Sequence, residues 1–248
     1  MLIYGKSEKG PVREKNEDSF ALEMIGNYLC MAVADGVGGE VCGEIASKIA
    51  VDSSMNLLKK SIPFVKERDE LPSLLKQIFN NVNIDILHDC LEHRERLGMC
   101  TTLTIALIKD TELTIAHIGD TRGYLLHASE LIKLTEDHER TTELIKKGII
   151  TEEEAKDHPD KGKLCMVLGE NKYLNPDIYS YNISYGDLVF LCSDGLYSYM
   201  SPEEFKSCTM PRNNPESICT KLIEQALKGQ SSDNITVTIG KAERRAEL

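Results

Sequence analysis

Two hydrophobic runs in this sequence each stop at an Asp-Gly pair, and this feature limits the possible folds most. Residues 29–34 lead directly into Asp35-Gly36, and residues 188–193 lead into Asp194-Gly195. Apolar runs of this length indicate buried strands, and a glycine lets the backbone turn where a strand ends. A third carboxylate, Asp233, opens the β-prone segment that follows it. Converging carboxylates repel one another unless a divalent cation with oxygen ligands compensates them, so the pattern points to a metal-dependent enzyme.

Composition narrows the class of protein further. The chain has 248 residues, of which 41% are hydrophobic and 6% aromatic, with no Trp, so the core must be mainly aliphatic. A chain of this length forms one large domain or two small ones. The formal net charge is −11. Because nucleic acids and anionic membranes attract basic surfaces, we expect neither as a partner.

The cysteines and the N-terminal segment indicate a reducing compartment. The 8 cysteines are scattered without a C-x-x-C pair, and several lie in apolar segments, where a free cysteine acts as a small hydrophobe. Residues 1–6 lack the apolar stretch of a signal peptide. The apolar runs are also far shorter than the ~20 residues that span a bilayer. We therefore expect a reduced cytoplasmic protein without a zinc site or a disulfide framework.

The order of the apolar patterns predicts blocks of strands separated by pairs of helices. Strands are expected at residues 19–24, 28–34, 101–109, 112–118, 122–127, 177–183, 187–193 and 234–239, and helices at 42–59, 71–96, 196–208 and 215–228. Residues 138–170 are the least regular part, with two short helices expected inside a long excursion. This order, without a regular alternation of strand and helix, favours an α+β domain of mostly antiparallel sheets covered by helices.

Short polar and acidic segments follow one another in a recognisable order. They are residues 13–19 (REKNEDS), 35–39 (DGVGG), 101–102 (TT), 118–122 (IGDTR), 134–138 (LTEDH), 192–196 (CSDGL) and 232–237 (SDNITV). Each segment alone is a weak signal, because Asp and Gly are common in turns. Together they resemble the metal-dependent protein phosphatases of type 2C, the PPM family, and especially its compact bacterial serine/threonine phosphatases. The resemblance extends over residues 6–240.

This resemblance implies a four-layer αββα sandwich, in which two antiparallel β-sheets are flanked by helices. A flap would be inserted at about residues 138–170, and it is the segment we expect to contribute most to substrate selection. Residues 1–241 would form a single catalytic domain, and residues 242–248 a charged C-terminal tail.

The same resemblance implies a centre of two Mn²⁺ or Mg²⁺ ions. Asp35 would bridge the two ions, and the Gly36 carbonyl would bind one of them. Asp194 and Asp233 would hold the other ion, and Asp18 would act through a metal-bound water. Taken singly, each aspartate could equally be a turn or cap residue. Their joint placement beside strand ends favours the metal site.

Asp120 matches the position that, together with Asp194, supports a third and weaker metal in bacterial members of the family. The competing interpretation is a turn in which Asp120 forms a salt bridge with Arg122. Arg122 itself and the paired Thr101 and Thr102 are expected to be structural.

The implied reaction is hydrolysis of a phosphomonoester by a hydroxide that bridges the two metals, without a phosphoenzyme. Arg13 matches the residue that binds the substrate phosphate in the family. Its planar guanidinium can hold two phosphate oxygens at once, which a lysine could not do.

Several positions depart from the family pattern. Val37 stands where eukaryotic members often carry a histidine that is a candidate general acid, and Glu40 stands where many bacterial members carry a histidine. A metal-bound water or Glu40 would then protonate the leaving group. Cys100 replaces a usual glycine, and Met166 replaces a common arginine. His158 lies in the flap and is a candidate for substrate contact.

We therefore expect a monomeric cytoplasmic phosphatase that acts in signal transduction. Its substrates would be proteins phosphorylated on serine or threonine by a kinase of the same cell. Two alternatives stay open: a pseudophosphatase that binds and regulates a partner, and a related hydrolase of phosphotyrosine or small phosphomonoesters. A kinase or nucleotide-binding protein is disfavoured, because the sequence lacks a Gly-rich phosphate loop followed by a lysine.

Overall fold

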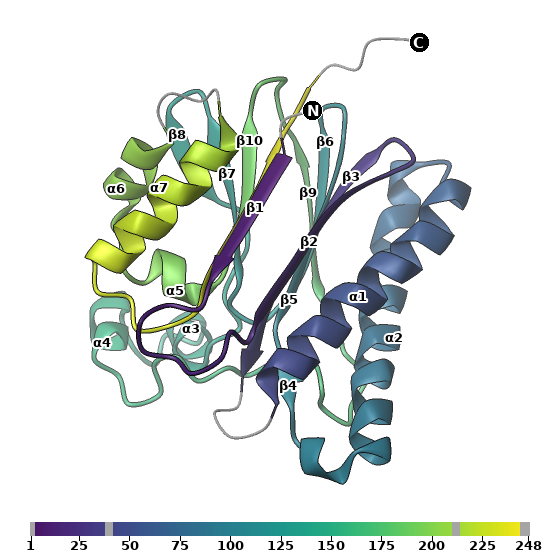
Figure 1. Ribbon diagram of the computed structural model, residues 1–248, viewed down its shortest axis with the longest axis horizontal. Coiled ribbons are helices and arrows are strands. Elements are labelled where there is room, and N and C mark those ends of the chain that lie inside the picture. The colour runs from purple at the N-terminus through teal and green to yellow at the C-terminus, as the bar shows by residue number, and fades with distance from the viewer. Residues whose placement is uncertain (1–2, 38–41, 210–213, 244–248) are drawn as a thin grey trace.

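The computed structural model describes residues 3–37, 42–209 and 214–243, which form two antiparallel β-sheets packed face to face (Figure 1). The first sheet contains, in spatial order, β1 (Ile3–Glu8), β11 (Ile235–Lys241), β10 (Leu188–Cys192), β7 (Arg122–His127) and β8 (Glu130–Lys133). The second contains β2 (Asp18–Ile25), β3 (Tyr28–Val37), β5 (Leu103–Lys109), β6 (Glu112–Ile118) and β9 (Asp177–Asn182), with the short β4 (Cys100–Thr101) paired to β3.

Helices cover the outer face of each sheet. On the second sheet lie α1 (Gly43–Ser61) and α2 (Leu71–Glu92), and on the first lie α5 (Asp194–Tyr197), α6 (Pro202–Cys208) and α7 (Pro215–Lys228). The 3₁₀ turns η1 (Ile62–Phe64), η2 (Arg68–Glu70) and η3 (Arg94–Arg96) flank α2. The helices α3 (Arg140–Lys146) and α4 (Glu152–Lys156) lie in the flap segment. The predicted sandwich of two antiparallel sheets flanked by helices is confirmed.

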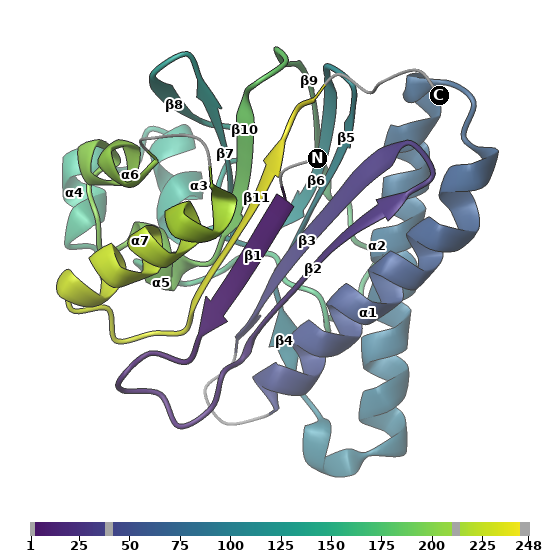
Figure 2. The same ribbon diagram turned by 45° about the horizontal axis from the view of Figure 1, so that its top comes forward.

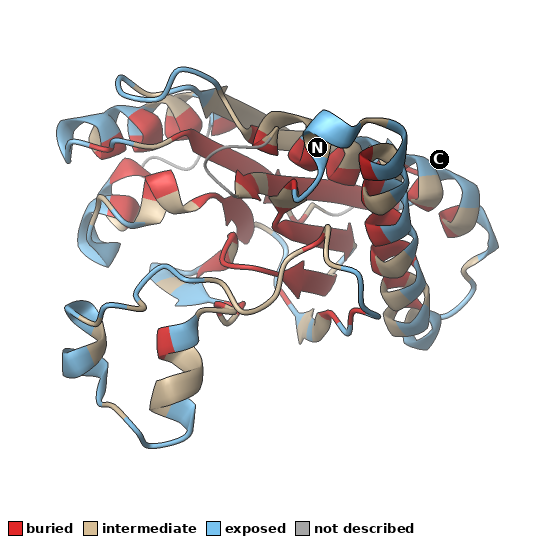
Figure 3. Cartoon of the chain, turned by 90° about the horizontal axis from the view of Figure 1, so that it is seen from below, coloured by how far each residue is buried: buried red, intermediate tan, exposed pale blue. Residues whose placement is uncertain are grey.

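The strand β3 shows why the sheets stack in this way. Leu29, Met31 and Val33 point into the layer between the two sheets, and the alternate positions of the same strand point toward α1 and α2. The positions that face the helices carry small side chains, which lets the helices approach the sheet closely. Residues 28–34 are buried on both faces of the strand, so they read as a continuous apolar run. Figure 3 shows the strands of the sandwich largely buried and the outer sides of the helices exposed.

Two strands are present that the sequence pattern did not indicate. β1 is largely polar and pairs only with β11, and β8 has 4 residues at the opposite edge of the same sheet. A strand at the edge of a sheet pairs with one neighbour and is partly exposed, so its sequence does not show the apolar pattern of a buried strand.

Two predicted helices have different ends in the structure. The helix predicted at 71–96 stops at Glu92, because His93 is extended with φ −128° and ψ 91°. The helix predicted at 196–208 is two helices, α5 and α6. Ser201 caps α6, its side chain accepting the Glu204 N–H, and Pro202 occupies the first turn, where a proline starts a helix.

The chain stays packed one residue beyond β11. Ala242 is fully buried, and its N–H donates to the Asp187 carbonyl at 3.0 Å. Its own carbonyl accepts the Gly186 N–H at 2.8 Å. Within the three described ranges, none of the helices combines the length and the apolar character that crossing a membrane requires.

Candidate metal centre

Carboxylates from both sheets meet at one end of the sandwich. Asp18 at the start of β2 is paired with Asp35 near the end of β3. Asp194 follows β10 and Asp233 precedes β11, while Asp120 lies in the connection between β6 and β7. The structure therefore brings together the aspartates that the sequence singled out.

A cavity of about 220 Å³ opens between these strand ends. Its lining includes Arg13, Glu17, Asp35, Gly36, Val37, Asp120, Asp194, Asp233 and Asn234, together with Gly162 and Leu164 from the flap. Asp18 is not part of the lining and lies buried beside it, with 8% of its surface exposed.

The backbone of Asp35 is fixed by the two threonines that the sequence placed at the next strand. The Asp35 N–H donates to Thr102 Oγ1 at 2.9 Å, and the Thr101 hydroxyl donates to the Asp35 carbonyl at 2.9 Å. Both threonines are fully buried. They fix the backbone of Asp35 and so position its carboxylate, as expected for structural residues.

Only glycine fits at position 36. A Cβ there would stand 2.2 Å from the Gly43 carbonyl oxygen at the start of α1, a distance that no real contact reaches. The Gly36 N–H donates to the Glu17 carbonyl at 3.0 Å. The close approach of β3, α1 and the segment before β2 therefore depends on the missing side chain.

Asp18 and Asp194 each keep one buried carboxylate oxygen, Oδ1, without a hydrogen-bond partner in the structure. Ser193 donates to the other oxygen of Asp18 at 2.7 Å. Burial raises the pKa of Asp18 to about 7, and the charges of Asp194 and Asp233 add to the effect. Burial and the charge of Asp233 raise the pKa of Asp194 to about 6. Such unpaired buried oxygens are costly unless a cation or a proton compensates them.

Asp120 is held by Tyr197, which the sequence did not indicate. The Tyr197 hydroxyl donates to the Asp120 carbonyl at 3.0 Å and to its Oδ2 at 3.4 Å. Burial, followed by the charge of Asp194, raises the pKa of Asp120 to about 8. The competing interpretation, a salt bridge between Asp120 and Arg122, is wrong. Arg122 pairs with Asp137 at 2.6 Å and lies over the Tyr197 ring at 3.5 Å from the centroid.

Arg13 lies at the mouth of the cavity and forms an ion pair with Asp233. Its Nη2 stands 2.6 Å from Asp233 Oδ2, and 45% of the Arg13 side chain is exposed. The hydrogen bond to Asp233 raises the pKa of Arg13 further. A guanidinium therefore compensates one carboxylate of the cluster directly.

The donor set fits divalent cations. The candidate ligands in the lining are the carboxylates of four aspartates and the carbonyl of Gly36, hard oxygen donors that Mg²⁺ and Mn²⁺ prefer. Burial and the neighbouring carboxylates raise the pKa of Asp35 well above its usual range. Among the described residues, no three His, Cys, Asp or Glu side chains already have their donor atoms arranged around one ion. In this structure Arg13 pairs with Asp233, one of the candidate ligands.

The remaining candidate residues stand apart from the cavity. Glu40 lies outside the described residues. His158 is partly buried in the flap, where its Nδ1 accepts the Asp160 N–H at 3.1 Å, and it is not in the described lining of the cavity. Val37 does line the cavity and presents an apolar surface there.

His138 joins the flap to the Asp120 connection, a link that the sequence did not indicate. Its Nδ1 accepts the Gly119 N–H at 3.1 Å, and its backbone N–H donates to the Gly119 carbonyl at 2.7 Å. At the other end of the flap, the Cys165 N–H donates to the His138 carbonyl at 2.8 Å. Both ends of the flap are thus attached at one residue beside the cavity.

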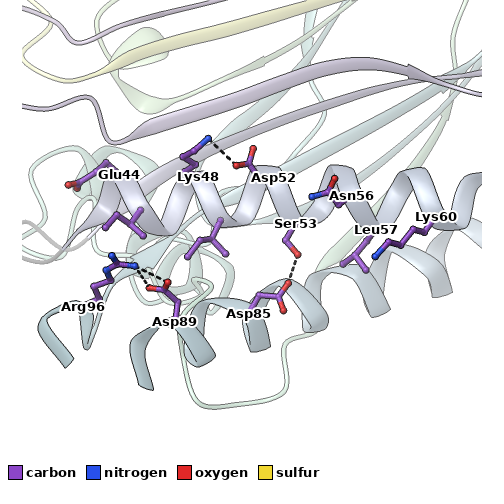
Figure 4. A pocket seen from close by; sticks show the side chains of 12 residues that line it. Glu44, Lys48, Asp52, Ser53, Asn56, Leu57, Lys60, Asp85, Asp89 and Arg96 are labelled. Carbon is purple, nitrogen blue, oxygen red and sulfur yellow. Dashed lines mark hydrogen bonds and ion pairs between the residues drawn. The ribbon is translucent and has the colours of Figure 1, made fainter. Parts of the chain in front are cut away.

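A larger hollow lies elsewhere, between α1 and α2 (Figure 4). It measures about 770 Å³ and is lined by an apolar strip of α1 and by charged residues of both helices. Its charges are largely paired within the groove, with Lys48 on Asp52 and Arg96 on Asp89. It contains none of the candidate residues, so size alone does not locate the functional site.

Comparison with known proteins agrees with this geometry. The family model described as Protein phosphatase 2C matches residues 12–228. The serine/threonine phosphatase stp of Listeria monocytogenes is 31% identical over 235 residues, which cover 94% of this chain and 93% of the relative. The crystal structure of the serine/threonine phosphatase Stp1 from Staphylococcus aureus superposes with a TM-score of 0.90 at 29% identity, covering 98% of this chain and 96% of that one. The catalytic domain of the protein phosphatase PstP, solved in complex with 2 manganese ions, has a TM-score of 0.80 at 32% identity and 96% coverage of both chains.

Proposed function

The chain belongs to the protein phosphatase 2C family, and from this premise we infer that it is a metal-dependent protein phosphatase acting on phosphoserine and phosphothreonine. The observation that carries the inference is the gathering of Asp35, Asp194 and Asp233 around one cavity from three separate strand ends. The relatives named as serine/threonine phosphatases match over most of the chain, which supports the same activity. Nothing in the described residues or in these relatives favours a pseudophosphatase.

We propose that the cavity holds two Mn²⁺ or Mg²⁺ ions, through Asp35, the Gly36 carbonyl, Asp194 and Asp233. Support comes from the oxygen-only donor set, from the unpaired buried oxygen of Asp194 and from the two manganese ions named for the related PstP domain. When bound, such ions neutralise the substrate phosphate and lower the pKa of a coordinated water.

Two further aspartates would complete the centre. Asp18 is proposed to act through a water molecule, since its unpaired Oδ1 is buried beside the cavity and not in its lining. Asp120, with Asp194, is proposed to hold a third and weaker ion. What supports this is that Asp120 lines the cavity and that Asp194 contributes to its raised pKa.

Arg13 is proposed to bind the substrate phosphate. Its exposed guanidinium stands at the mouth of the cavity and can present two N–H groups to two phosphate oxygens. Phosphate binding requires Arg13 to leave Asp233, which a cation bound by Asp233 would favour. We therefore expect binding of the substrate phosphate by Arg13 to be coupled to binding of a cation by Asp233.

The group that protonates the leaving oxygen of serine or threonine is proposed to be Glu40 or a water in the centre. Val37 cannot supply a proton, and it lines the cavity at the position where eukaryotic relatives often carry a histidine. A Glu40→Gln variant with normal turnover would exclude Glu40 as the proton donor and leave the water in that role.

The substrates are proposed to be proteins phosphorylated by a Ser/Thr kinase of the same cell, selected in part by the flap. Gly162 and Leu164 bring the flap to the edge of the cavity, and His158 is the flap residue proposed to contact substrate. We further propose a monomeric cytoplasmic protein that acts in signal transduction. Residues 1–241 would be its catalytic domain and 242–248 its tail.

The test is phosphate release from a phosphothreonine peptide, a phosphoserine peptide, a phosphotyrosine peptide and a small aryl phosphate, each with Mn²⁺ and with EDTA. We expect turnover of the first two only with metal, and a higher kcat/KM for them than for the others. Preference for the phosphotyrosine peptide or the small ester would assign the site to another phosphomonoesterase. No turnover of any substrate at saturating Mn²⁺ would contradict the proposed function.

A further inference from the structure

The loop between β1 and β2, residues 9–17 (Figure 2), carries Arg13, and the side chain of Asn234, near the other end of the sequence, makes three hydrogen bonds to its backbone. We propose that Asn234 is a positioning residue for substrate binding, which fixes this loop so that the Arg13 guanidinium stays at the cavity. The inference rests on the proposed function, because that function assigns Arg13 to the substrate phosphate.

Both the Nδ2 and the Oδ1 of the Asn234 side-chain amide form hydrogen bonds with the backbone of the loop. Its Nδ2 donates to the Lys9 carbonyl at 2.8 Å and to the Lys15 carbonyl at 2.9 Å. Its Oδ1 accepts the Glu17 N–H at 2.8 Å. Asn234 is 3% exposed, so these bonds are shielded from water. Two carbonyls need donors and one N–H needs an acceptor, which also fixes the orientation of the amide.

No other side chain of this length meets the same demand. Aspartate would place a negative charge against two carbonyl oxygens and could donate to neither. Alanine would leave two carbonyls and one N–H without partners in a buried place, and each unpaired group is costly. The geometry thus requires an amide at position 234 for a reason unrelated to metal binding.

The middle of the loop has few other attachments. Within the described residues, the backbone of residues 11–14 forms no hydrogen bond with another backbone group. Gly10 lies against the Asp233 carbonyl with φ +76°, where a Cβ would stand 2.3 Å from that oxygen. The position of Arg13 therefore depends on the two clamped ends of the loop and on its own ion pair with Asp233.

The same residue links the loop to the metal centre. The Asn234 N–H donates to Asp233 Oδ1 at 2.8 Å, and the Glu17 carbonyl accepts the Gly36 N–H at 3.0 Å. A loop fixed in this way keeps the phosphate-binding cation at a constant distance from the carboxylates. Displacement of a substrate-positioning group by about 1 Å can lower activity by roughly a hundredfold.

The test is a double-mutant cycle of Asn234→Ala and Arg13→Ala, with kcat/KM for a phosphothreonine peptide measured at saturating Mn²⁺. We expect Asn234→Ala to lower kcat/KM about tenfold or more when Arg13 is present, mainly through KM, and less than about twofold when Arg13 is absent. Mn²⁺ binding by the single variant Asn234→Ala, measured by calorimetry, is expected to stay within about threefold of the wild type. Equal losses in both backgrounds, or loss of Mn²⁺ binding, would overturn the proposal.

Asn80→Ala is the matched control. Asn80 also makes three hydrogen bonds that fix a loop, donating to the Lys76 and Leu174 carbonyls and accepting the Leu174 N–H, far from residues 9–17. It should lower the thermal midpoint without changing KM. If Asn234→Ala does not fold, Gly10→Ala replaces it in the cycle, because a Cβ at position 10 would push the other end of the loop away from the Asp233 carbonyl. We expect Gly10→Ala also to lower kcat/KM only when Arg13 is present.

Failure of the proposed function can be told apart from failure of this inference. If the wild type hydrolyses no phosphopeptide, the function is wrong, and hydrogen exchange of the Glu17 amide, which donates to Asn234 Oδ1, still tests the clamp. We expect this amide to exchange at least about tenfold faster in Asn234→Ala than in the wild type or Asn80→Ala. Unchanged exchange would refute the inference whatever the activity.

Discussion

Lowering the pH is expected to stabilise this protein when its metals are removed by EDTA. Burial, with mutual repulsion, raises the pKa of Asp194 to about 6, that of Asp18 to about 7 and that of Asp120 to about 8. In the unfolded chain all three lose their protons near pH 4. The folded state therefore binds more protons than the unfolded state at neutral pH, and its stability falls as the pH rises through these values.

The magnitude follows from proton linkage. Each extra proton held by the folded state contributes about 1.4 kcal/mol of stability per pH unit. Integrated from about pH 6.5 to pH 8.5, these three carboxyls give a loss on the order of 3 kcal/mol, which lowers the thermal midpoint by roughly 10 °C. Asp35, whose pKa burial and the neighbouring carboxylates also raise, adds a loss of the same sign. The fully buried His117, whose pKa burial lowers to about 3, acts in the opposite direction, but its effect ends soon above pH 7.

The assay is thermal unfolding across this pH range for the wild type, Asp120→Asn and Asp137→Asn. Asp120→Asn should remove roughly two thirds of the slope that Asp18, Asp120 and Asp194 contribute together, and it should stabilise the metal-free protein at the alkaline end. Burial alone would raise the pKa of Asp137, but its ion pair with Arg122 outweighs burial and lowers that pKa. Asp137→Asn should therefore destabilise the folded protein by about 3 kcal/mol at every pH in this range. Saturating Mn²⁺ should flatten the wild-type profile. A flat profile in EDTA, or one that Asp120→Asn leaves unchanged, would refute the reasoning.

Other substitutions test separate parts of the account. Arg13→Ala should tighten Mn²⁺ binding about fivefold in calorimetry, because Arg13 competes for Asp233 at 2.6 Å, while raising KM for a phosphopeptide; unchanged Mn²⁺ affinity would count against the ion pair. Gly36→Ala should weaken Mn²⁺ binding at least about tenfold, since its Cβ would meet the Gly43 carbonyl at 2.2 Å; wild-type affinity would show that α1 can move aside. Phe190→Ala should lower the free energy of unfolding in urea by about 3–5 kcal/mol, as the side chain is fully buried under α6 and α7; a loss below about 1 kcal/mol would contradict that packing.

The sequence could predict that Asp35, Asp194 and Asp233 lie together, because each of them stands next to a strong strand signal. Asp35 and Asp194 follow continuous apolar runs, and such runs are buried on both faces wherever they occur in a layered fold. Once the strands are stacked, carboxylates at their ends must meet at the same edge of the sandwich.

The supporting residues could not be predicted, because they depend on contacts between distant parts of the chain. Asn234 holds a loop some 220 positions earlier, as its bonds to Lys9 and Lys15 show. That contact exists only because the polar edge strand β1 pairs with β11, and β1 has no periodicity to reveal it. Tyr197 reaches Asp120 for a similar reason, since α5 turns back immediately after β10.

The most direct test of the central claim is a calorimetric titration with Mn²⁺ of the wild type and of Asp194→Asn, with phosphate release from a phosphothreonine peptide followed in the same samples. Two bound ions per chain and turnover that rises with their occupancy are predicted for the wild type, and the loss of at least one ion and of turnover for the folded variant. Turnover that persists in EDTA, or in Asp194→Asn with its metal binding lost, would contradict a carboxylate-held metal centre.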